Sequence, residues 1–384
     1  MRRKNQYMGG CISLAQTQII FNSRIFWRQL ATWTRAYLNS RYLGIGIAED
    51  VFGHLLNVPS ELSSILRLTF GGEVSEKYYQ LLTQQIIILR ELITAQLDGN
   101  REAVGQNVDR LYRNGETRAA FLASLNPLWN EAEWKNMIDT YLNLTIEEAN
   151  SFAIGNYSRN IEAFDNLTTQ TDIMGDYFAH GLYHYITGTA PGFNQPITIG
   201  QCISYDQMTI LYYIRIFWFE MAAWTRAFIV SSAINPVYSD KAYERLRQVP
   251  IRYGNLLKTF FNEEMVNQNL QLIDAHINLI HNLVTAQINN NQEEVNKTVQ
   301  LLYQNSDERA AILAQMNPYL DQNQWRGVLY TYLRSTIEEI TTFLTGDYER
   351  NIDIYQRLID QTEQISNIFS ESLFNFISVN QPSL

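Results

Sequence analysis

The chain has 384 residues, of which 46% are hydrophobic and 18% charged, which is enough for two ordinary globular domains with full cores. Its formal net charge of -10 argues against a general affinity for nucleic-acid backbones or anionic membrane surfaces. Its two cysteines, Cys11 and Cys202, are too few for a disulfide framework and lack metal-ligand spacing, so a reducing cell interior is the expected compartment.

Neither the N-terminal segment nor the most apolar window of the sequence predicts a signal peptide or a membrane span. The start, "MRRKNQYMGG", carries positive charges, but the following "CISLAQTQII" has polar residues where a signal peptide needs an apolar core. The most apolar window, residues 210–234, contains Arg215, Glu220 and Arg226. Because charges inside a bilayer are costly, this window predicts a buried helix and not a membrane span.

The sequence is an internal duplication with an offset of 191 residues, and the match is ungapped from 11–193 to 202–384. The word "FWRQLATWTRAYLNS" at residue 26 returns as "FWFEMAAWTRAFIVS" at residue 217, and "YSRNI" returns as "YERNI". This period is far longer than that of a solenoid repeat. We therefore predict a tail at 1–10, one domain at 11–186, a Gly/Pro-punctuated linker at 187–201 and a second domain at 202–384.

Helical spacing of apolar residues runs through each copy. The opening word is apolar on most sides and predicts a central helix. Short helices are expected around Pro59, followed by a long helix at 74–97 whose counterpart is 265–288. Asn100 is a candidate N-cap for a helix that stops at Asn126 before a proline.

The rest of each copy contains a short predicted helix at 130–142 and a long one. Thr145 and Glu148 have the spacing of a capping box before a run that ends near Ile186, and Thr336 with Glu339 repeats it. Neither copy shows alternating strand patterns. We predict an all-α protein of two tandem, pseudo-symmetric bundles, each with four main helices plus short ones.

One arginine stands inside the apolar opening helix at the same position in both copies. Arg35 and Arg226 must either reach water or meet an acidic partner. Among carboxylates kept in both copies we favour Glu148 for Arg35 and Glu339 for Arg226, followed by Glu147 and Glu338. The alternatives are an arginine that extends to solvent, with Trp33 and Trp224 packed in the core, and an arginine that faces a ligand anion.

Motifs of catalysis are absent from the sequence. His180 and His184 have the i, i+4 spacing that can share a metal, but Glu371 and Asn375 replace them in the second copy and no further ligands stand nearby. No phosphate-binding loop, dinucleotide fingerprint or nucleophile elbow occurs. We therefore expect no enzyme, no cofactor, and no catalytic, cofactor-binding or metal-binding residues.

The words "CIS", "WTR", "TIEE" and "YERNI", with "NP" between them, resemble a family of short, single-copy helical proteins common in Gram-positive bacteria, and each copy matches one whole member. The family has no settled activity. The resemblance implies histidines at three positions per copy, where this chain instead has Leu30 and Met221, Gln85 and His276, and Tyr141 and Tyr332. The loss of five of these six favours a scaffold over a catalyst.

These observations lead to two alternative functions. The first is a non-catalytic structural or adaptor protein that acts through protein contacts, as a homo- or hetero-oligomer or in a larger assembly. The second is a small-molecule- or metal-binding bundle, with or without catalysis, whose pocket lies near Trp33 and Arg35 and near Trp224 and Arg226. The expected location is intracellular, or a virus particle if the Asn- and Ile-rich composition reflects a large DNA virus and not a low-GC bacterium.

Overall fold

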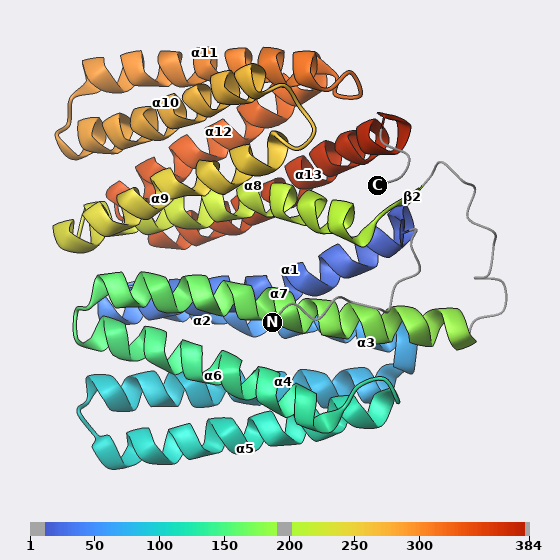
Figure 1. Ribbon diagram of the computed structural model, residues 1–384. Coiled ribbons are helices and arrows are strands. Elements are labelled where there is room, and N and C mark those ends of the chain that lie inside the picture. The colour runs from blue at the N-terminus through green and yellow to red at the C-terminus, as the bar shows by residue number, and fades with distance from the viewer. Residues whose placement is uncertain (1–11, 190–201, 381–384) are drawn as a thin grey trace. The chain divides into compact units, whose positions relative to one another are not determined.

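The computed structural model describes residues 12–189 and 202–380, which fall into two compact units. Within the described ranges, the N-terminal unit spans 15–189, and the C-terminal unit combines 12–14 with 202–380. The helices of the N-terminal unit (Figure 1) are α1(Leu14–Tyr42), α2(Ala48–Asn57), α3(Pro59–Phe70), α4(Gly72–Leu97), α5(Arg101–Leu125), α6(Glu131–Ala153) and α7(Tyr157–Thr189).

The C-terminal unit repeats this order with one change. Its elements are β1(Ile12–Ser13), β2(Cys202–Ile203), α8(Tyr205–Ser232), α9(Pro236–Leu257), α10(Glu263–Ile288), α11(Gln292–Met316), α12(Gln322–Leu344) and α13(Tyr348–Asn380). The bounds of α4 to α7 recur in α10 to α13 at the 191-residue offset. The single helix α9, with Pro250 inside it, replaces α2 and α3, which are separated at Pro59. The described chain is therefore all-helical apart from two two-residue strands.

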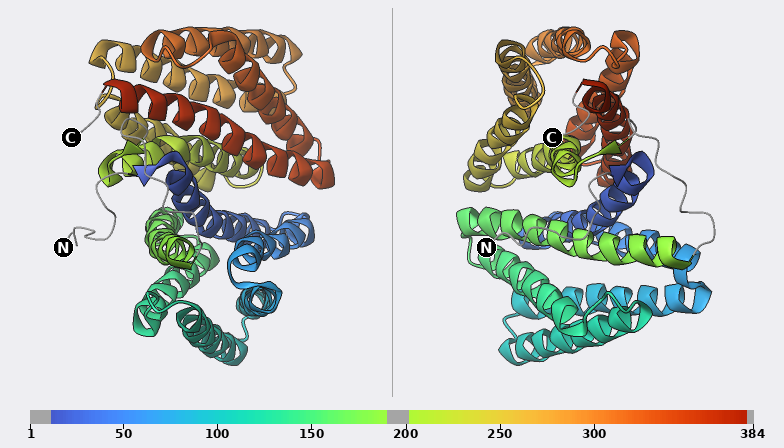
Figure 2. Two further views of the ribbon diagram at one scale, coloured as in Figure 1. Left: turned by 90° about the vertical axis from the view of Figure 1, so that its right-hand side faces the viewer. Right: turned by 45° about the vertical axis from the view of Figure 1, so that its right-hand side comes forward.

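The helices α4 to α7, and likewise α10 to α13, pack side by side with the next helix along the chain. Figures 1 and 2 show α4 beside α5 in one unit and α10 beside α11 in the other. The connection between α4 and α5 is short, and the Asn100 side chain caps α5 as predicted, since its Oδ1 accepts a hydrogen bond from Ala103 N at 3.1 Å. Every residue from 26 to 40 is buried, so the opening word forms the central helix that its pattern predicts.

The two strands place the start of the chain on the C-terminal unit. They pair antiparallel, with Ile12 opposite Ile203 and Ser13 opposite Cys202. Ile12 and Ile203 are equivalent at the 191-residue offset, so the same word from each copy forms both strands. Residues 12–14 group with the C-terminal unit, whereas the sequence prediction placed them in the first domain, 11–186. Backbone pairing of two residues leaves no side-chain pattern from which to predict it.

The ends of the last two helices in each copy also differ from the prediction. Thr145 lies inside α6, where its Oγ1 donates to the carbonyl oxygen of Tyr141 at 2.9 Å, and Thr336 is placed in the same way in α12. The break comes later, at Gly155 with φ of 71°, and Asn156 Oδ1 then caps α7. The short helix predicted at 130–142 is the first half of α6, so the N-terminal unit has five long helices and not four.

Two further sequence predictions concern the linker and the possibility of a membrane span. Helix α7 continues to Thr189, into the predicted linker 187–201, and residues 190–201 and Cys11 lie outside the described residues. None of the helices in the described ranges combines the length and the apolar character that crossing a bilayer requires.

We expect residues 1–193 to fold alone and to melt cooperatively, because the N-terminal unit contains seven helices with their own buried faces. A shorter fragment, 15–193, should melt at nearly the same temperature, since the strand at 12–13 pairs with the C-terminal unit. Circular dichroism melts of both fragments measure this. A soluble fragment without a cooperative transition would contradict the expectation.

Candidate functional site

A buried ion pair joins α1 to α6 in the N-terminal unit. Arg35 is 4% exposed and Glu148 is fully buried. The guanidinium Nη1 of Arg35 donates to Glu148 Oε1 at 2.5 Å. The later helix break places Glu148 within α6, one turn beyond Thr145, and not at a helix N-terminus. Glu148 can therefore face α1, and the partner favoured from the sequence is the one present.

The same pair occurs in the C-terminal unit. Arg226 Nη1 donates to Glu339 Oε1 at 2.8 Å, and both side chains are buried. The two pairs have the same separation along the chain, 113 residues. The "WTR" word contains the arginine and the "TIEE" word contains the glutamate. Both words are therefore retained in both copies because their side chains form one ion pair.

An asparagine from the last helix of each unit completes the cluster, and the sequence analysis did not find it. Asn351 Oδ1 accepts a hydrogen bond from Arg226 Nη1 at 3.0 Å, while its Nδ2 donates to the carbonyl oxygen of Glu339 at 2.8 Å. Asn160 Nδ2 makes the equivalent bond to the carbonyl oxygen of Glu148 at 3.0 Å. Both asparagines belong to the repeated "RNI" words, and this repetition was the available signal.

An aromatic ring lies against each guanidinium. The Cζ of Arg35 is 4.5 Å from the ring centroid of Phe164, and that of Arg226 is 4.3 Å from the centroid of Tyr355. Phe164 and Tyr355 are equivalent at the 191-residue offset. A cation over an aromatic face gains electrostatic stabilisation, which is larger away from water. We call Arg35, Glu148, Asn160 and Phe164, with their equivalents Arg226, Glu339, Asn351 and Tyr355, the buried polar clusters.

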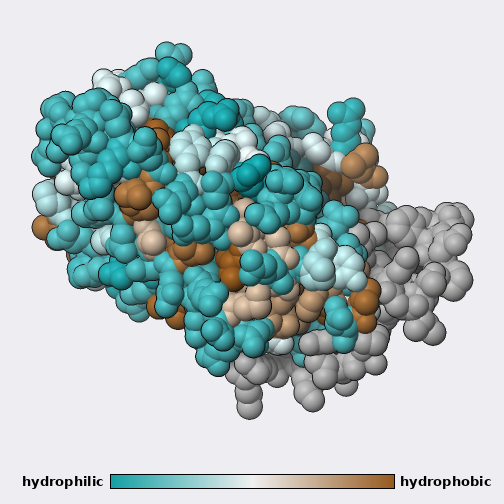
Figure 3. Space-filling model, turned by 90° about the horizontal axis from the view of Figure 1, so that it is seen from above, coloured by the Kyte–Doolittle hydropathy of each residue, from teal (hydrophilic) through white to brown (hydrophobic). Residues whose placement is uncertain are grey.

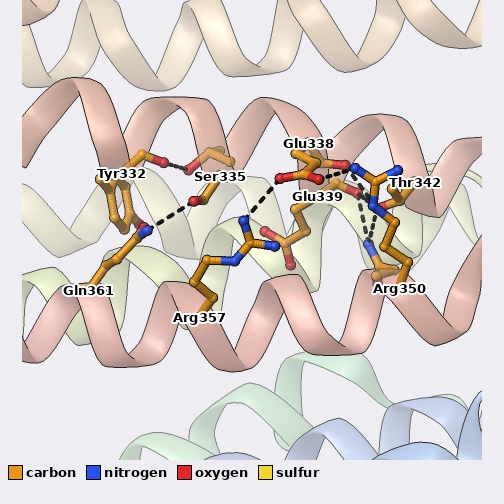
Figure 4. Close-up of polar contacts among 10 residues, drawn as sticks. Tyr332, Ser335, Glu338, Glu339, Thr342, Arg350, Arg357 and Gln361 are labelled. Carbon is orange, nitrogen blue, oxygen red and sulfur yellow. Dashed lines mark hydrogen bonds and ion pairs between the residues drawn. The ribbon is translucent and has the colours of Figure 1, made fainter.

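The carboxylates that the sequence analysis ranked next, Glu147 and Glu338, form a separate set of ion pairs that are partly exposed to solvent. Glu147 pairs with Arg159, and Glu338 pairs with Arg350 and, at 3.3 Å, with Arg357. Figure 4 shows Glu338 of α12 facing the two arginines of α13. Neighbouring residues of a helix point to different faces, so the two glutamates of each "TIEE" word serve different surroundings.

Burial controls the protonation of the paired glutamates. Removal from water raises the pKa of Glu148 to about 7, against the opposing attraction of Arg35. Its second oxygen, Oε2, is buried with no hydrogen-bond partner in the described chain, so one half of the carboxylate is left unsolvated. Burial likewise raises the pKa of Glu339, with Arg226 acting in the opposite direction.

The N-terminal unit contains two more buried arginine pairs that the sequence analysis missed. Arg28 Nη2 donates to Asp172 Oδ2 at 3.0 Å, and Arg24 pairs with Asp176. Both bonds tie α1 to α7. The second copy has Phe219 at the position of Arg28, so a search restricted to residues kept in both copies could not find this pair.

Three other positions considered in the sequence analysis, Trp33, His180 and His184, lie in α1 and α7. The rings of His180 and His184 lie with centroids 4.6 Å apart. Across the described ranges, no group of three or more histidine, cysteine, aspartate or glutamate side chains is arranged to hold a metal ion. Trp33 stacks on His54, with ring centroids 5.0 Å apart, and its indole is buried.

Comparison with protein-family models, curated protein sequences and solved structures finds no match to this chain. A function must therefore be inferred from the geometry of the buried polar clusters. Each cluster binds three helices together through side chains that solvent does not reach.

We expect Glu148→Ala to lower the free energy of unfolding by about 3–5 kcal/mol at pH 8, because it leaves the buried Arg35 cation without its partner. Arg35→Ala should cost less, since a stranded glutamate can take up a proton whereas arginine keeps its charge. Thermal melts of both variants and of the double variant measure this as a mutant cycle. Arg159→Ala, which removes an exposed partner of Glu147, is the matched control and should cost much less. Additive single effects would contradict a coupled pair.

The raised pKa of Glu148 predicts a pH-dependent contribution to stability. Between about pH 4.5 and pH 7 the native state binds this proton more tightly than the unfolded chain does, so the contribution falls as pH rises through that window. The size is on the order of 3 kcal/mol. His276, whose pKa burial lowers to about 3, acts in the opposite sense, so the comparison must be between variants.

Urea unfolding of the wild type and of Glu148→Gln across pH 4 to 8 provides that comparison. The wild type should lose stability relative to the variant as the pH rises, and Glu147→Gln, at the partly exposed neighbour, should keep the wild-type profile. Parallel profiles for the wild type and Glu148→Gln would mean that Glu148 does not titrate in this range.

Proposed function

We propose that the chain is a non-catalytic structural or adaptor protein that acts through protein contacts. It consists of two tandem, pseudo-symmetric helical bundles. The proposal rests on one observation: the polar residues of the repeated sequence words form the buried polar clusters. Arg35 pairs with Glu148, and Asn160 bonds to the backbone of Glu148, inside the N-terminal unit, and the equivalent residues make the same contacts in the C-terminal unit. Side chains that are paired inside the bundle hold the helices together and do not face a substrate.

The duplication supports the same proposal because it gives one chain two similar surfaces. Apolar side chains are exposed at equivalent positions in both copies, at Leu97 and Ile288 (45% and 44% exposed) and at Leu128 and Tyr319 (47% and 44% exposed). Seen from above (Figure 3), the surface is mainly hydrophilic, with apolar side chains in separate patches. Repeated apolar positions of this kind suit contact with a symmetric partner or with two copies of one partner.

The resemblance of both copies to short helical proteins of Gram-positive bacteria belongs to the same proposal. A fused pair of such domains, without five of the six histidines that the resemblance implies, fits a scaffold that forms homo- or hetero-oligomers. Its place of action is the cell interior or, for a chain of viral origin, the virus particle. The alternative, a small-molecule or metal-binding bundle with its pocket near Trp33 and Arg35, predicts a bound component that the scaffold does not need.

Two measurements on the full-length protein distinguish these functions. Metal analysis and native mass spectrometry of protein purified from its source should find neither a stoichiometric transition metal nor an organic ligand. Cross-linking in source cells through exposed lysines such as Lys135 and Lys297 should join the chain to one recurring protein. A stoichiometric metal or organic ligand without any recurring protein neighbour would overturn the scaffold in favour of the alternative.

A further inference from the structure

The two short strands are formed by one sequence word and its repeat. β1 contains Ile12 and Ser13 of the first "CIS", and β2 contains Cys202 and Ile203 of the second. In the antiparallel pair, Ile12 lies opposite Ile203, its equivalent at the 191-residue offset. A pairing centred on two equivalent residues has a local twofold axis, which is the symmetry of a contact between two identical copies. The pair therefore has the form of a dimer contact, enclosed here in one chain.

β2 is held in place by residues of its own unit. Ile203 is 3% exposed, and the strand lies against α13. Directly after it, Ser204 forms a capping box at the start of α8, in which its Oγ accepts a hydrogen bond from Gln207 N at 3.1 Å and its N–H donates to Gln207 Oε1 at 2.9 Å. β2 is thus a fixed edge of the C-terminal unit, and its outward backbone groups require a strand to pair with.

β1 is joined directly to the other unit. The helix α1 begins at Leu14, and from Ala15 onward the chain belongs to the N-terminal unit. The "CIS" word is identical in both copies, whereas the next two positions differ, with Tyr205 and Asp206 in place of Leu14 and Ala15. The repeated words of the buried polar clusters make their contacts inside one unit, but the partner of this word is its own repeat. Pairing of the word with itself accounts for its identity in both copies.

We propose that β2 is a docking site for the "CIS" strand of a second copy of this chain, and that two chains associate by exchanging β1. The strand of one chain takes the place of β1 on the other, with Ile12 opposite Ile203 as within one chain. Reciprocal exchange forms a closed dimer and leaves neither β2 without a strand. The inference deepens the proposed function, on which it rests for the premise that the chain acts through protein contacts.

Protein concentration determines which pairing is populated. A strand tethered to the same chain has a high effective concentration, so pairing within one chain prevails in dilute solution. A ribbon of two strands with two residues each is only marginally stable by itself, so β1 leaves β2 at a low energetic cost. Exchange replaces each contact by an identical one, and the dimer therefore grows as the protein is concentrated.

Disulfide trapping between two full-length chains tests the exchange. Both chains contain Cys11→Ser; the first also contains Ser13→Cys and Cys202→Ser, and the second keeps Cys202. Residues 13 and 202 are opposite each other in the pair, which places them within the span of a disulfide. After mixing at high concentration and mild oxidation, the mixed dimer should be about tenfold more abundant than in a control with Ser158→Cys instead of Ser13→Cys, because docking raises the local thiol concentration. Ser158 is exposed in α7 and reports random collisions.

A single variant then compares locked and free strands. A chain with Cys11→Ser and Ser13→Cys keeps Cys202 opposite residue 13. Oxidised in dilute solution, it should form this disulfide within the chain and hold β1 on its own β2. Light scattering of the concentrated protein should find a monomer after oxidation. After reduction, the same protein should form a share of dimer that rises with concentration.

Three results would overturn the exchange. They are a mixed dimer no more abundant than in the Ser158→Cys control, no internal disulfide in the single variant, and equal association of its oxidised and reduced forms. None of these results bears on contacts with other proteins, which the cross-linking in source cells measures. The failure of the exchange and the failure of the proposed function are therefore distinguishable.

Discussion

The cost of placing a guanidinium inside a helix bundle is the constraint on which each unit depends. Helix α1 is buried along the whole word from 26 to 40, so Arg35 has no route to water. It can be accommodated only where an acceptor comes to it, and Glu148 of α6 is that acceptor. Because a charge-assisted bond tolerates little displacement, the pair sets the position of α6 along α1. The same holds for Arg226 and Glu339.

The asparagine of the last helix extends this constraint to a third element. Asn351 bonds both to the guanidinium of Arg226 and to the backbone of α12, so α8, α12 and α13 meet at one point. A buried ion pair of this kind contributes little net stability compared with apolar packing of the same volume. We infer that its value is geometric, because alternative packings of these apolar helices would leave a charge unpaired. The raised pKa of Glu148 is consistent with that limited energetic gain.

Buried arginines recur in this chain, and the partners differ in each case. Arg28 meets Asp172, Arg118 meets the amide oxygen of Asn114, and the buried Nε of Arg309 has no hydrogen-bond partner in the described chain. Duplication explains the difference in physical terms. After a domain is copied, each copy can change independently: the second copy has Phe219 in place of Arg28, whereas Asn305 retains the position of Asn114 but its Oδ1 has no partner.

The sequence by itself determined the helical class, the duplication and the candidates for the central ion pair. Periodicity and recurrence are properties of neighbouring or aligned positions, so they can be read without knowing which helices touch. The tertiary structure decided where α6 ends, because Thr145 can bond either its own helix or a cap and only packing selects between them. It also decided the contributions of Asn160 and Asp172, and the pairing of Ile12 with Ile203. Each of these depends on which distant segments become neighbours, and no local pattern in the sequence records that.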